Sequence, residues 1–164
     1  MEQPALRDVL PSDLDALLAI NSECEAMLSP LTREQLWGMV EIAYRARVTA
    51  DRSAMLVAFD ERASYGSPNF AWFRERYPRF VYVDRVAVLP YARGRGIARR
   101  LYEDLIEAAR ADGYTLLACE IYSDPPNPPS DAFHASMGFV EVGSAYVPAY
   151  AKTVRYLVCE VRPE

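Results

Sequence analysis

A short turn rich in arginine and glycine is the part of this sequence that most directly indicates chemistry. The stretch RGRGIARR, residues 93–100, follows an apolar segment that ends at Pro90 and precedes an amphipathic segment that ends at Gly113. A strand, a tight turn and a helix in this order direct free backbone N–H groups and the positive end of the helix toward one point. Gly94 and Gly96 carry no Cβ, so phosphate oxygens can approach the main chain closely. The stretch therefore predicts an anion site rather than a tight turn with solvated arginines.

Two common phosphate motifs do not fit this turn. The P-loop pattern G-x-x-x-x-G-K-[ST] is absent, and the dinucleotide pattern G-x-G-x-x-G fails at its third glycine, where Arg99 stands. The turn also lies about halfway along the chain, not in the first strand–helix unit as in a nucleotide-binding fold. These features disfavour a Rossmann-type NAD protein.

The only histidine of the chain, His134, lies in the stretch NPPSDAFHASMGF, residues 127–139. Pro128 and Pro129 suit the first turn of a short helix that runs through Met137. The residue type alone leaves two interpretations of His134. It is either a group that exchanges protons near neutral pH, or a packed ring that donates to a backbone carbonyl.

Both stretches resemble the GNAT superfamily of N-acetyltransferases. The stretch AFHASMGF is similar to the family's later aliphatic-Tyr-x-x-x-Gly-Phe stretch. The longer stretch DPPNPPSDAFH resembles an uncharacterised bacterial group of this superfamily with a PPNPxSxxFH pattern. The family signature R/Q-x-x-G-x-G/A is matched by Arg93-Gly94-Arg95-Gly96-Ile97-Ala98.

The resemblance implies how acetyl-CoA is held as a co-substrate. The amides of residues 93–98 would bind its pyrophosphate, and the strand residues Val86, Ala87 and Val88 would pair with the pantetheine arm through their backbone. A backbone N–H of the same strand would stabilise the oxyanion. Asn127 lies seven residues before His134, as the family's asparagine lies before its tyrosine. Asn127 would then bind the pantetheine or orient the end of the preceding strand.

His134 stands where the family commonly has a tyrosine that protonates the departing thiolate. A tyrosine, with a reference pKa of about 10, is protonated at neutral pH, whereas a histidine, at about 6.5, is mostly neutral but keeps one N–H to donate. The histidine ring could also accept the amine proton. The resemblance therefore favours catalysis or cofactor contact for His134, with the packed ring as the alternative.

Acetyl transfer also needs a group that takes the amine proton, because an α-amine has a reference pKa of about 8 and a lysine amine of about 10.4. Glu120 ranks first, because family members that act on N-terminal amines place a catalytic glutamate on this strand. Asp84 ranks second, and it shares one face of the segment 80–90 with Tyr82. Other family members place base residues at these two positions, so Tyr82 is the third candidate, although it is expected rather to shape the pocket. The alternatives are an ion pair or an exposed position for Glu120, a salt bridge with a nearby arginine for Asp84, and a water chain in place of any direct base.

The alternation of side chains along a strand gives two further expectations. Arg85 should point away from the face that carries Asp84 and be structural. Cys119 should face away from Glu120 and pack as a small apolar group, which disfavours a covalent acyl-cysteine.

The segment 61–79, ERASYGSPNFAWFRERYPR, is long for a loop inside a compact domain. One interpretation is a short helix that covers a sheet edge. The other is a substrate-side lid whose aromatic residues Tyr65, Phe70 and Trp72 shape the acceptor pocket. The two interpretations are compatible.

The remaining patterns predict the elements that position these residues. Apolar spacing predicts helices over 11–28, 31–46, 96–113 and 128–137, the second opened by a capping box of Thr32 and Gln35. Strands are expected over 5–9, 45–50, 53–60, 80–90, 115–122, 139–147 and 152–161. We therefore predict an α/β (α+β) GNAT fold: a central mixed, mostly antiparallel sheet of six to seven strands flanked by about four helices.

Composition limits the class of protein. A chain of 164 residues is expected to form one domain, residues 1–164, and its net charge of −5 argues against nucleic-acid binding. Three scattered cysteines without a C-x-x-C pair favour a reducing cytoplasm and no metal site. The acidic N-terminus and the absence of a long apolar run predict neither a signal peptide nor a membrane segment.

The sequence thus predicts an N-acetyltransferase that moves an acetyl group from acetyl-CoA to a primary amine, of a small molecule or a peptide N-terminus, by direct attack in a ternary complex. The alternative is a non-catalytic sensor or scaffold that binds acyl-CoA, which the missing tyrosine favours. A homodimer through the last strands is implied by the resemblance alone.

Overall fold

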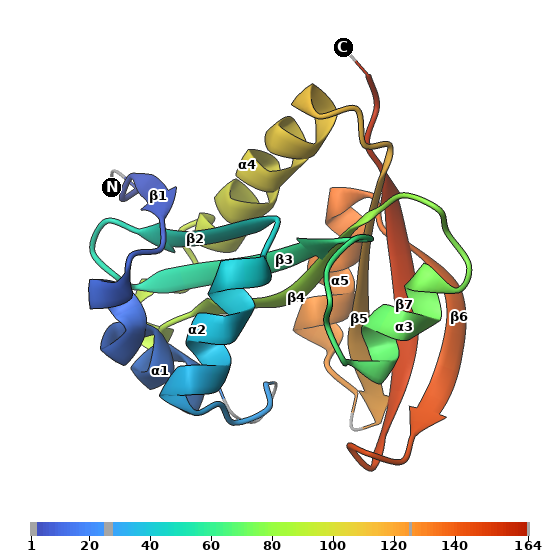
Figure 1. The fold of residues 1–164 in the computed structure, drawn as a ribbon, viewed down its shortest axis with the longest axis horizontal. Helices are drawn as coiled ribbons and strands as arrows, with labels where there is room; N and C mark the ends of the chain where they lie inside the picture. The colour runs from blue at the N-terminus through green and yellow to red at the C-terminus, as the bar shows by residue number, and fades with distance from the viewer. Residues whose placement is uncertain (1–2, 25–27, 125, 164) are drawn as a thin grey trace.

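The computed structural model describes residues 3–24, 28–124 and 126–163. Its seven strands form one sheet in the order β1-β2-β3-β4-β5-β7-β6 (Figure 1). Every neighbouring pair is antiparallel except β4 and β5, which are parallel. This confirms the predicted mixed, mostly antiparallel sheet. The strands are β1 (Leu6–Asp8), β2 (Arg45–Thr49), β3 (Ala54–Asp60), β4 (Val81–Val88), β5 (Leu116–Asp124), β6 (Val140–Val147) and β7 (Lys152–Glu160).

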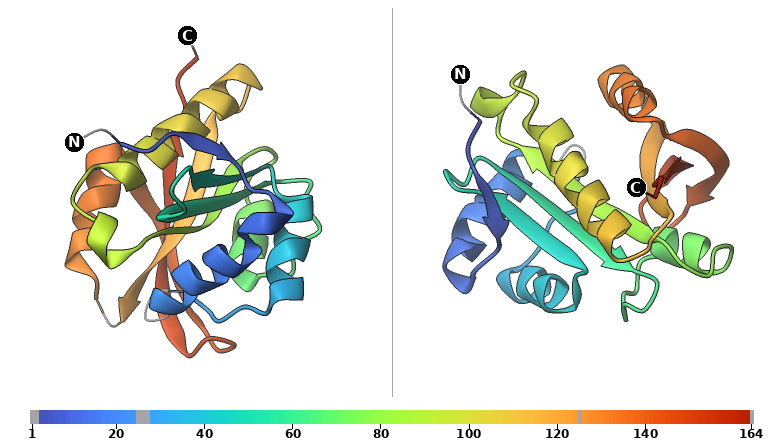
Figure 2. Two further views of the ribbon diagram at one scale, coloured as in Figure 1. Left: turned by 90° about the vertical axis from the view of Figure 1, so that its left-hand side faces the viewer. Right: turned by 90° about the horizontal axis from the view of Figure 1, so that it is seen from above.

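Five α-helices cover the two faces of this sheet, with α4 and α5 on one side and α1, α2 and α3 on the other (Figure 2). They exceed the predicted four because a short helix forms inside the segment 61–79. Two 3-10 turns, η1 (Pro11–Asp13) and η2 (Pro90–Ala92), precede α1 and α4. The helices are α1 (Leu14–Glu23), α2 (Arg33–Ile42), α3 (Pro68–Arg74), α4 (Ile97–Ala111) and α5 (Pro128–Met137).

Local sequence explains where the helices begin. The predicted capping box of α2 is present, with Thr32 accepting from the N–H of Gln35 and the Gln35 side chain accepting from the N–H of Thr32. In α3 the Ser67 hydroxyl accepts from two backbone N–H groups, and Pro68 occupies the first helical position. Within the described residues no helix is both long enough and apolar enough to cross a membrane.

A β-bulge in β4 shifts the alternation of its side chains. Val57 of β3 pairs with Arg85 and the next residue, Ala58, pairs with Val83, so Asp84 is an additional residue on β4. An additional residue reverses which face the following side chains occupy. Arg85 therefore lies on the same face as Asp84, and the expectation that Arg85 points away is wrong.

The sheet opens between its two parallel strands. β4 and β5 pair only at Val81 with Leu117 and Tyr82 with Ala118, although both strands are fully described over longer ranges. Beyond these pairs the two halves of the sheet diverge, as Figure 2 shows in its right-hand view. The strand residues that carry the predicted catalytic groups lie at this opening.

Candidate active site

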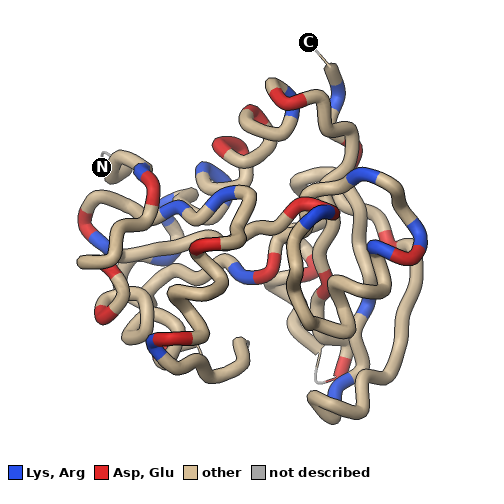
Figure 3. The backbone as a smooth tube through the Cα atoms, viewed as in Figure 1, with Lys and Arg blue, Asp and Glu red and all other residues tan. Residues whose placement is uncertain are grey.

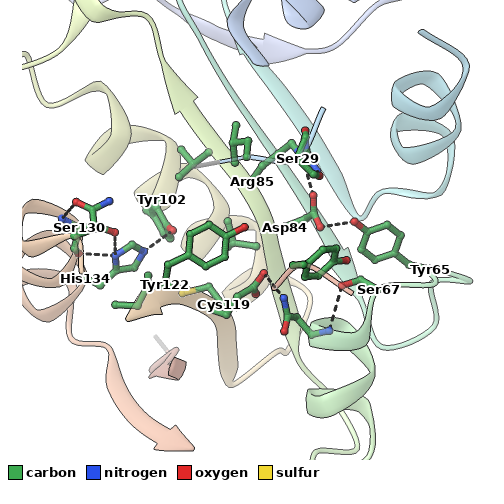
Figure 4. A pocket seen from close by; sticks show the side chains of 18 residues that line it. Ser29, Tyr65, Ser67, Asp84, Arg85, Tyr102, Cys119, Tyr122, Ser130 and His134 are labelled. Atoms are coloured by element: carbon green, nitrogen blue, oxygen red, sulfur yellow. Dashed lines mark hydrogen bonds and ion pairs between the residues drawn. The ribbon is translucent and has the colours of Figure 1, made fainter. Parts of the chain in front are cut away.

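A cavity occupies the opening between β4 and β5 (Figure 4). His134 and Tyr102 line one end, on the side of α4 and α5, and Tyr65 and Ser67 line the other, beside α3. The cavity therefore joins the two faces of the sheet. Its lining includes Leu28, Ser29, Asn69, Val83, Asp84, Arg85, Val86, Cys119, Glu120, Ile121, Tyr122, Asn127, Ser130 and Tyr150.

Glu120 lies at the centre of a hydrogen-bonded array. The Tyr82 hydroxyl is 2.9 and 2.7 Å from the two carboxylate oxygens, and the Asn69 side chain donates to Oε1 at 3.2 Å. Behind Asn69, the Tyr156 hydroxyl donates to its Oδ1 at 2.9 Å. Tyr82 and Tyr156 are 0% and 2% exposed, so the array is fixed by the core. The carboxylate is thereby held in one orientation in the cavity.

Burial raises the pKa of Glu120 from its ordinary 4.5 to about 8. The negative charge of Asp84 acts in the same direction, whereas the hydrogen bonds from Tyr82 and Asn69 lower the pKa and offset part of the rise. A carboxylate with a pKa near the working pH is a stronger base than an exposed glutamate. The environment of Glu120 thus suits a group that takes a proton from an amine.

Asp84 is engaged in an ion pair. Arg85 Nε donates to its Oδ2 at 2.7 Å, and the Tyr65 hydroxyl donates to its Oδ1 at 2.5 Å. The two side chains of the pair are 5% and 6% exposed, and Arg85 also donates to Asn21 at 2.7 Å. The salt bridge that the sequence left open as an alternative for Asp84 is present. Its partner is the neighbouring residue, which the bulge turns to the same face.

The ring of His134 has its two nitrogens already engaged. Nδ1 is 2.7 Å from the carbonyl oxygen of Ser130, which can only accept, so Nδ1 carries the proton. Nε2 of the neutral ring is then an acceptor, and it accepts a hydrogen bond from the Tyr102 hydroxyl at 3.1 Å. Burial lowers the pKa of His134, which favours this neutral form. In this arrangement His134 has no N–H directed into the cavity.

The strand, turn and helix expected around the predicted anion site are present. Gly94 and Gly96 have φ of +78° and +76°, values in the left-handed region that side chains disfavour, and Gly96 is the N-cap of α4. Residues 93–96 are exposed. The Arg93 N–H donates to the carbonyl of Pro90 at 3.3 Å, and the Gln3 side chain donates to the carbonyl of Arg95. The Arg93 side chain donates to the carbonyl of Val88 at 3.0 Å and holds the turn against β4. Pyrophosphate binding by this turn stays a prediction.

The chain matches the family model described as the acetyltransferase (GNAT) family over residues 21–139. The chain belongs to the GNAT acetyltransferase family. No curated protein matches it significantly. The family match agrees with the signature at residues 93–98, which lies inside the matched range.

Solved GNAT structures share this fold over almost their whole length. Ard1 from Thermoplasma volcanium is 13% identical, with a TM-score of 0.77 and coverage of 98% of this chain and 99% of that one. The phosphinothricin acetyltransferase from Sinorhizobium meliloti, in complex with AcCoA, is 18% identical, with a TM-score of 0.72 and coverage of 99% and 94%. The ribosomal-protein-S18-alanine N-acetyltransferase from Escherichia coli is 15% identical, with a TM-score of 0.70 and coverage of 98% and 95%. At such identities the likeness concerns the fold.

The residues that the GNAT resemblance assigns to acetyl-CoA binding take different positions around the cavity. Val86 lines it, Ala87 packs in the core beside α1, and Val88 packs on the side of α4. Asn127 lines the cavity and caps α5, its side chain accepting from the N–H of Ser130. Ile97 is buried and Ala98 partly buried at the start of α4.

The segment 61–79 of this GNAT protein contains the predicted short helix, α3, and only one of its three candidate pocket residues lines the cavity. Tyr65 lines the cavity, whereas Phe70 is fully buried and Trp72 stacks on Tyr156 at 4.1 Å between ring centroids. Neither Phe70 nor Trp72 lines the cavity, because α3 turns these rings toward the core beneath it. Tyr82 is also fully buried. Its ring does not line the cavity, and its hydroxyl contacts Glu120, which does.

Sequence reasoning missed two polar side chains of the site, Asn69 and Tyr102. Asn69 is 3% exposed, and a single amide among aromatic residues was a signal that could have identified it. Tyr102 has no such signal, because its spacing in α4 is that of the apolar face. Cys119 is buried as predicted, and burial raises its thiol pKa well above the ordinary value, which makes it a poor nucleophile.

Proposed function

We propose that this GNAT acetyltransferase moves the acetyl group of acetyl-CoA to a primary amine, either of a small molecule or of a peptide N-terminus, by direct attack in a ternary complex. The observation that carries the proposal is the placement of Glu120, whose raised pKa and fixed orientation suit a general base between the two ends of the cavity. The amine enters beside Tyr65 and Ser67, and the thioester enters beside α5.

Glu120 takes the proton from the amine nitrogen. An α-amine has a reference pKa of about 8, so its transfer of a proton to a carboxylate with a pKa of about 8 is close to balanced. A lysine amine, at about 10.4, would give up its proton less readily. The match therefore favours a peptide N-terminus or another amine of low basicity as the acceptor.

The other predicted residues support this reaction from fixed positions. The amides of residues 93–98 bind the pyrophosphate, a backbone N–H of the Val86–Val88 segment meets the oxyanion, and Asn127 borders the pantetheine. Asp84, held by Arg85 and Tyr65, remains the second candidate for the base, and its charge contributes to the raised pKa of Glu120.

A screen of amines with acetyl-CoA tests this function, with the acetylated product identified by mass spectrometry. We expect turnover with at least one α-amine. Because His134 offers no N–H to the cavity, a non-catalytic acyl-CoA sensor is the second candidate function. It predicts micromolar binding of CoA without turnover of any amine.

The assembly is a separate part of the proposal. β6 is an edge strand, and Val140 and Tyr146 on it are 60% and 62% exposed. These exposed apolar side chains support a homodimer through the last strands. Light scattering of the protein in solution tests it, and a monomer at all concentrations contradicts it.

A further inference from the structure

A chain of two side chains reaches Glu120 from outside the cavity. The Asn69 amide donates from Nδ2 to Oε1 of Glu120 at 3.2 Å, and its Oδ1 accepts from the Tyr156 hydroxyl at 2.9 Å. Tyr156 does not line the cavity, and among the described residues no hydrogen bond joins it directly to Glu120. Asn69 is therefore the link between the core and the carboxylate.

The chemistry of these groups fixes the direction of both hydrogen bonds. An ionised carboxylate can only accept, so the amide must turn its Nδ2 toward Glu120 and its Oδ1 away from it. The reverse orientation of Asn69 would place two acceptor oxygens against each other. The Tyr156 hydroxyl supplies the donor that Oδ1 needs, and it thereby holds the amide in the orientation that stabilises the charged form of Glu120.

Helix α3 fixes both members of this chain. Asn69 is 3% exposed, and its backbone N–H donates to the hydroxyl of Ser67, the cap of the helix, at 3.2 Å. In the same helix, Trp72 stacks on the Tyr156 ring, with the centroids 4.1 Å apart and the ring planes at 14°. Trp72 fits there because Gly143 of β6 has no side chain, and a Cβ on Gly143 would lie 2.5 Å from the indole. One short helix thus holds the amide and the tyrosine that orients it.

From this geometry, and on the basis of the function proposed above, we propose that Asn69 is a positioning residue for the base Glu120, and that Tyr156 acts on the base only through Asn69. Asn69 itself exchanges no proton. It orients the carboxylate and stabilises its charge, in agreement with the lowering effect of this hydrogen bond on the pKa of Glu120. The helix within the segment 61–79 therefore supports the proton transfer in addition to lining the cavity.

The first test observes Glu120 directly and does not depend on turnover. The glutamate carboxyl carbons are labelled and titrated by NMR, and the signal that is missing in Glu120→Gln belongs to Glu120. Asn69→Leu keeps the approximate size of the side chain but donates no hydrogen bond. In this variant the pKa of Glu120 should rise from about 8 by about one unit. An unchanged pKa overturns the role of Asn69.

Tyr156→Phe is a milder variant, because it keeps the aromatic ring and removes only the hydroxyl. It leaves Oδ1 of Asn69 without its donor, so the pKa of Glu120 should rise, but by less than in Asn69→Leu. This variant also decides the question if Asn69→Leu does not fold, since an unchanged pKa contradicts the chain. Tyr114→Phe is the matched control. Tyr114 is 3% exposed and its hydroxyl lies 3.2 Å from Asp60, away from the cavity lining, so the pKa of Glu120 should stay the same.

The double variant Asn69→Leu/Tyr156→Phe tests whether Tyr156 acts through Asn69. The pKa of Glu120 in this variant should equal that in Asn69→Leu alone, because the hydroxyl has already lost the amide through which it acts. If loss of the hydroxyl raises the pKa equally with and without Asn69, the two residues act independently and the proposed chain is wrong.

The second test is kinetic and uses an amine that the wild-type protein acetylates. A pKa higher by one unit reduces the ionised fraction of Glu120 at neutral pH by about tenfold, so kcat/KM in Asn69→Leu should fall roughly tenfold. The rising limb of its pH profile should move upward by the same amount as the pKa measured by NMR. A purely structural role would lower the activity without moving the limb.

The outcomes separate this inference from the proposed function. A loss of activity in Asn69→Leu with the limb in its wild-type place overturns the role of Asn69 while the acetyltransferase function stands. Absence of turnover in the wild-type protein contradicts the function. In that case the NMR titration still decides whether Asn69 and Tyr156 hold the carboxylate of Glu120.

Discussion

The Tyr82 hydroxyl lies 2.9 and 2.7 Å from the two carboxylate oxygens of Glu120, deep in the opening between the parallel strands. Two opposing effects meet in this contact. Burial raises the pKa of Glu120 to about 8, and the hydrogen bond from Tyr82 lowers it, because the hydroxyl stabilises the ionised form. The pKa of Glu120 is therefore set by the balance between burial and this hydrogen bond.

The first prediction concerns the pH dependence of the reaction. Glu120 acts in its ionised form, so kcat/KM for the amine should rise with pH through about 8. Tyr82→Phe removes a hydrogen bond that lowers the pKa, and the rising limb should move to higher pH. The ionisation of the amine is the same for both proteins, so the shift between them belongs to the enzyme. An unchanged or lower midpoint contradicts the assignment.

The same pKa predicts an effect on stability. The folded pKa of about 8 lies above the ordinary 4.5, so the folded protein binds more protons than the unfolded chain between these values. The free energy of unfolding should therefore fall as the pH rises from about 4.5 to about 8. Glu120→Gln should lose this part of the slope in thermal unfolding at pH 6 and pH 9. Glu107→Gln, on the exposed side of α4, is the matched control and should keep the wild-type slope.

A third prediction tests the anion site. Gly96→Glu places a negative side chain at a residue with φ of +76°, where phosphate is expected to bind. CoA affinity should fall by at least about 100-fold, the equivalent of one or two charge-assisted hydrogen bonds. Gly113→Glu adds the same charge at a φ of +80° beyond the far end of α4, and should bind CoA normally. Equal binding by the two variants in calorimetry would falsify the site.

A fourth prediction concerns the ion pair of Asp84 and Arg85. Arg85→Met leaves Asp84 buried without its charged partner, which should reduce the free energy of unfolding by about 3–5 kcal/mol. The double variant Asp84→Leu/Arg85→Met removes both charges and should be more stable than Arg85→Met alone. Urea denaturation measures both changes. A double variant as unstable as the single one would show that packing, rather than the unpaired charge, dominates.

Figure 3 shows basic and acidic residues interspersed along the backbone, with arginines also at the start of α4. The sequence alone predicted a strand, a turn and a helix around these arginines, because a strand, glycines and arginines in this order permit few other structures. The fold was also predictable, because each element has its own periodic or capping signal, such as the Thr32–Gln35 capping box of α2.

The side chains of the site were harder to predict. Strand alternation placed Arg85 on the wrong face, because one additional residue at Asp84 reverses the pattern and leaves no trace in hydrophobicity. Tyr102 was missed because its place in the helix is that of a core residue. Its partner, His134, is 32 positions later and reaches it only through tertiary packing. Phe70 and Trp72 are aromatic residues of the kind that line pockets, but their rings pack in the core.

The most direct test of the central claim compares wild-type protein with Glu120→Gln, using an α-amine and acetyl-CoA and following both product formation and CoA binding. The substitution removes the base but keeps the shape of the side chain and one acceptor oxygen. We predict a decrease in turnover of roughly 10²- to 10⁴-fold with CoA affinity unchanged. Turnover in Glu120→Gln equal to that of the wild-type protein would contradict the assignment of Glu120 as the base.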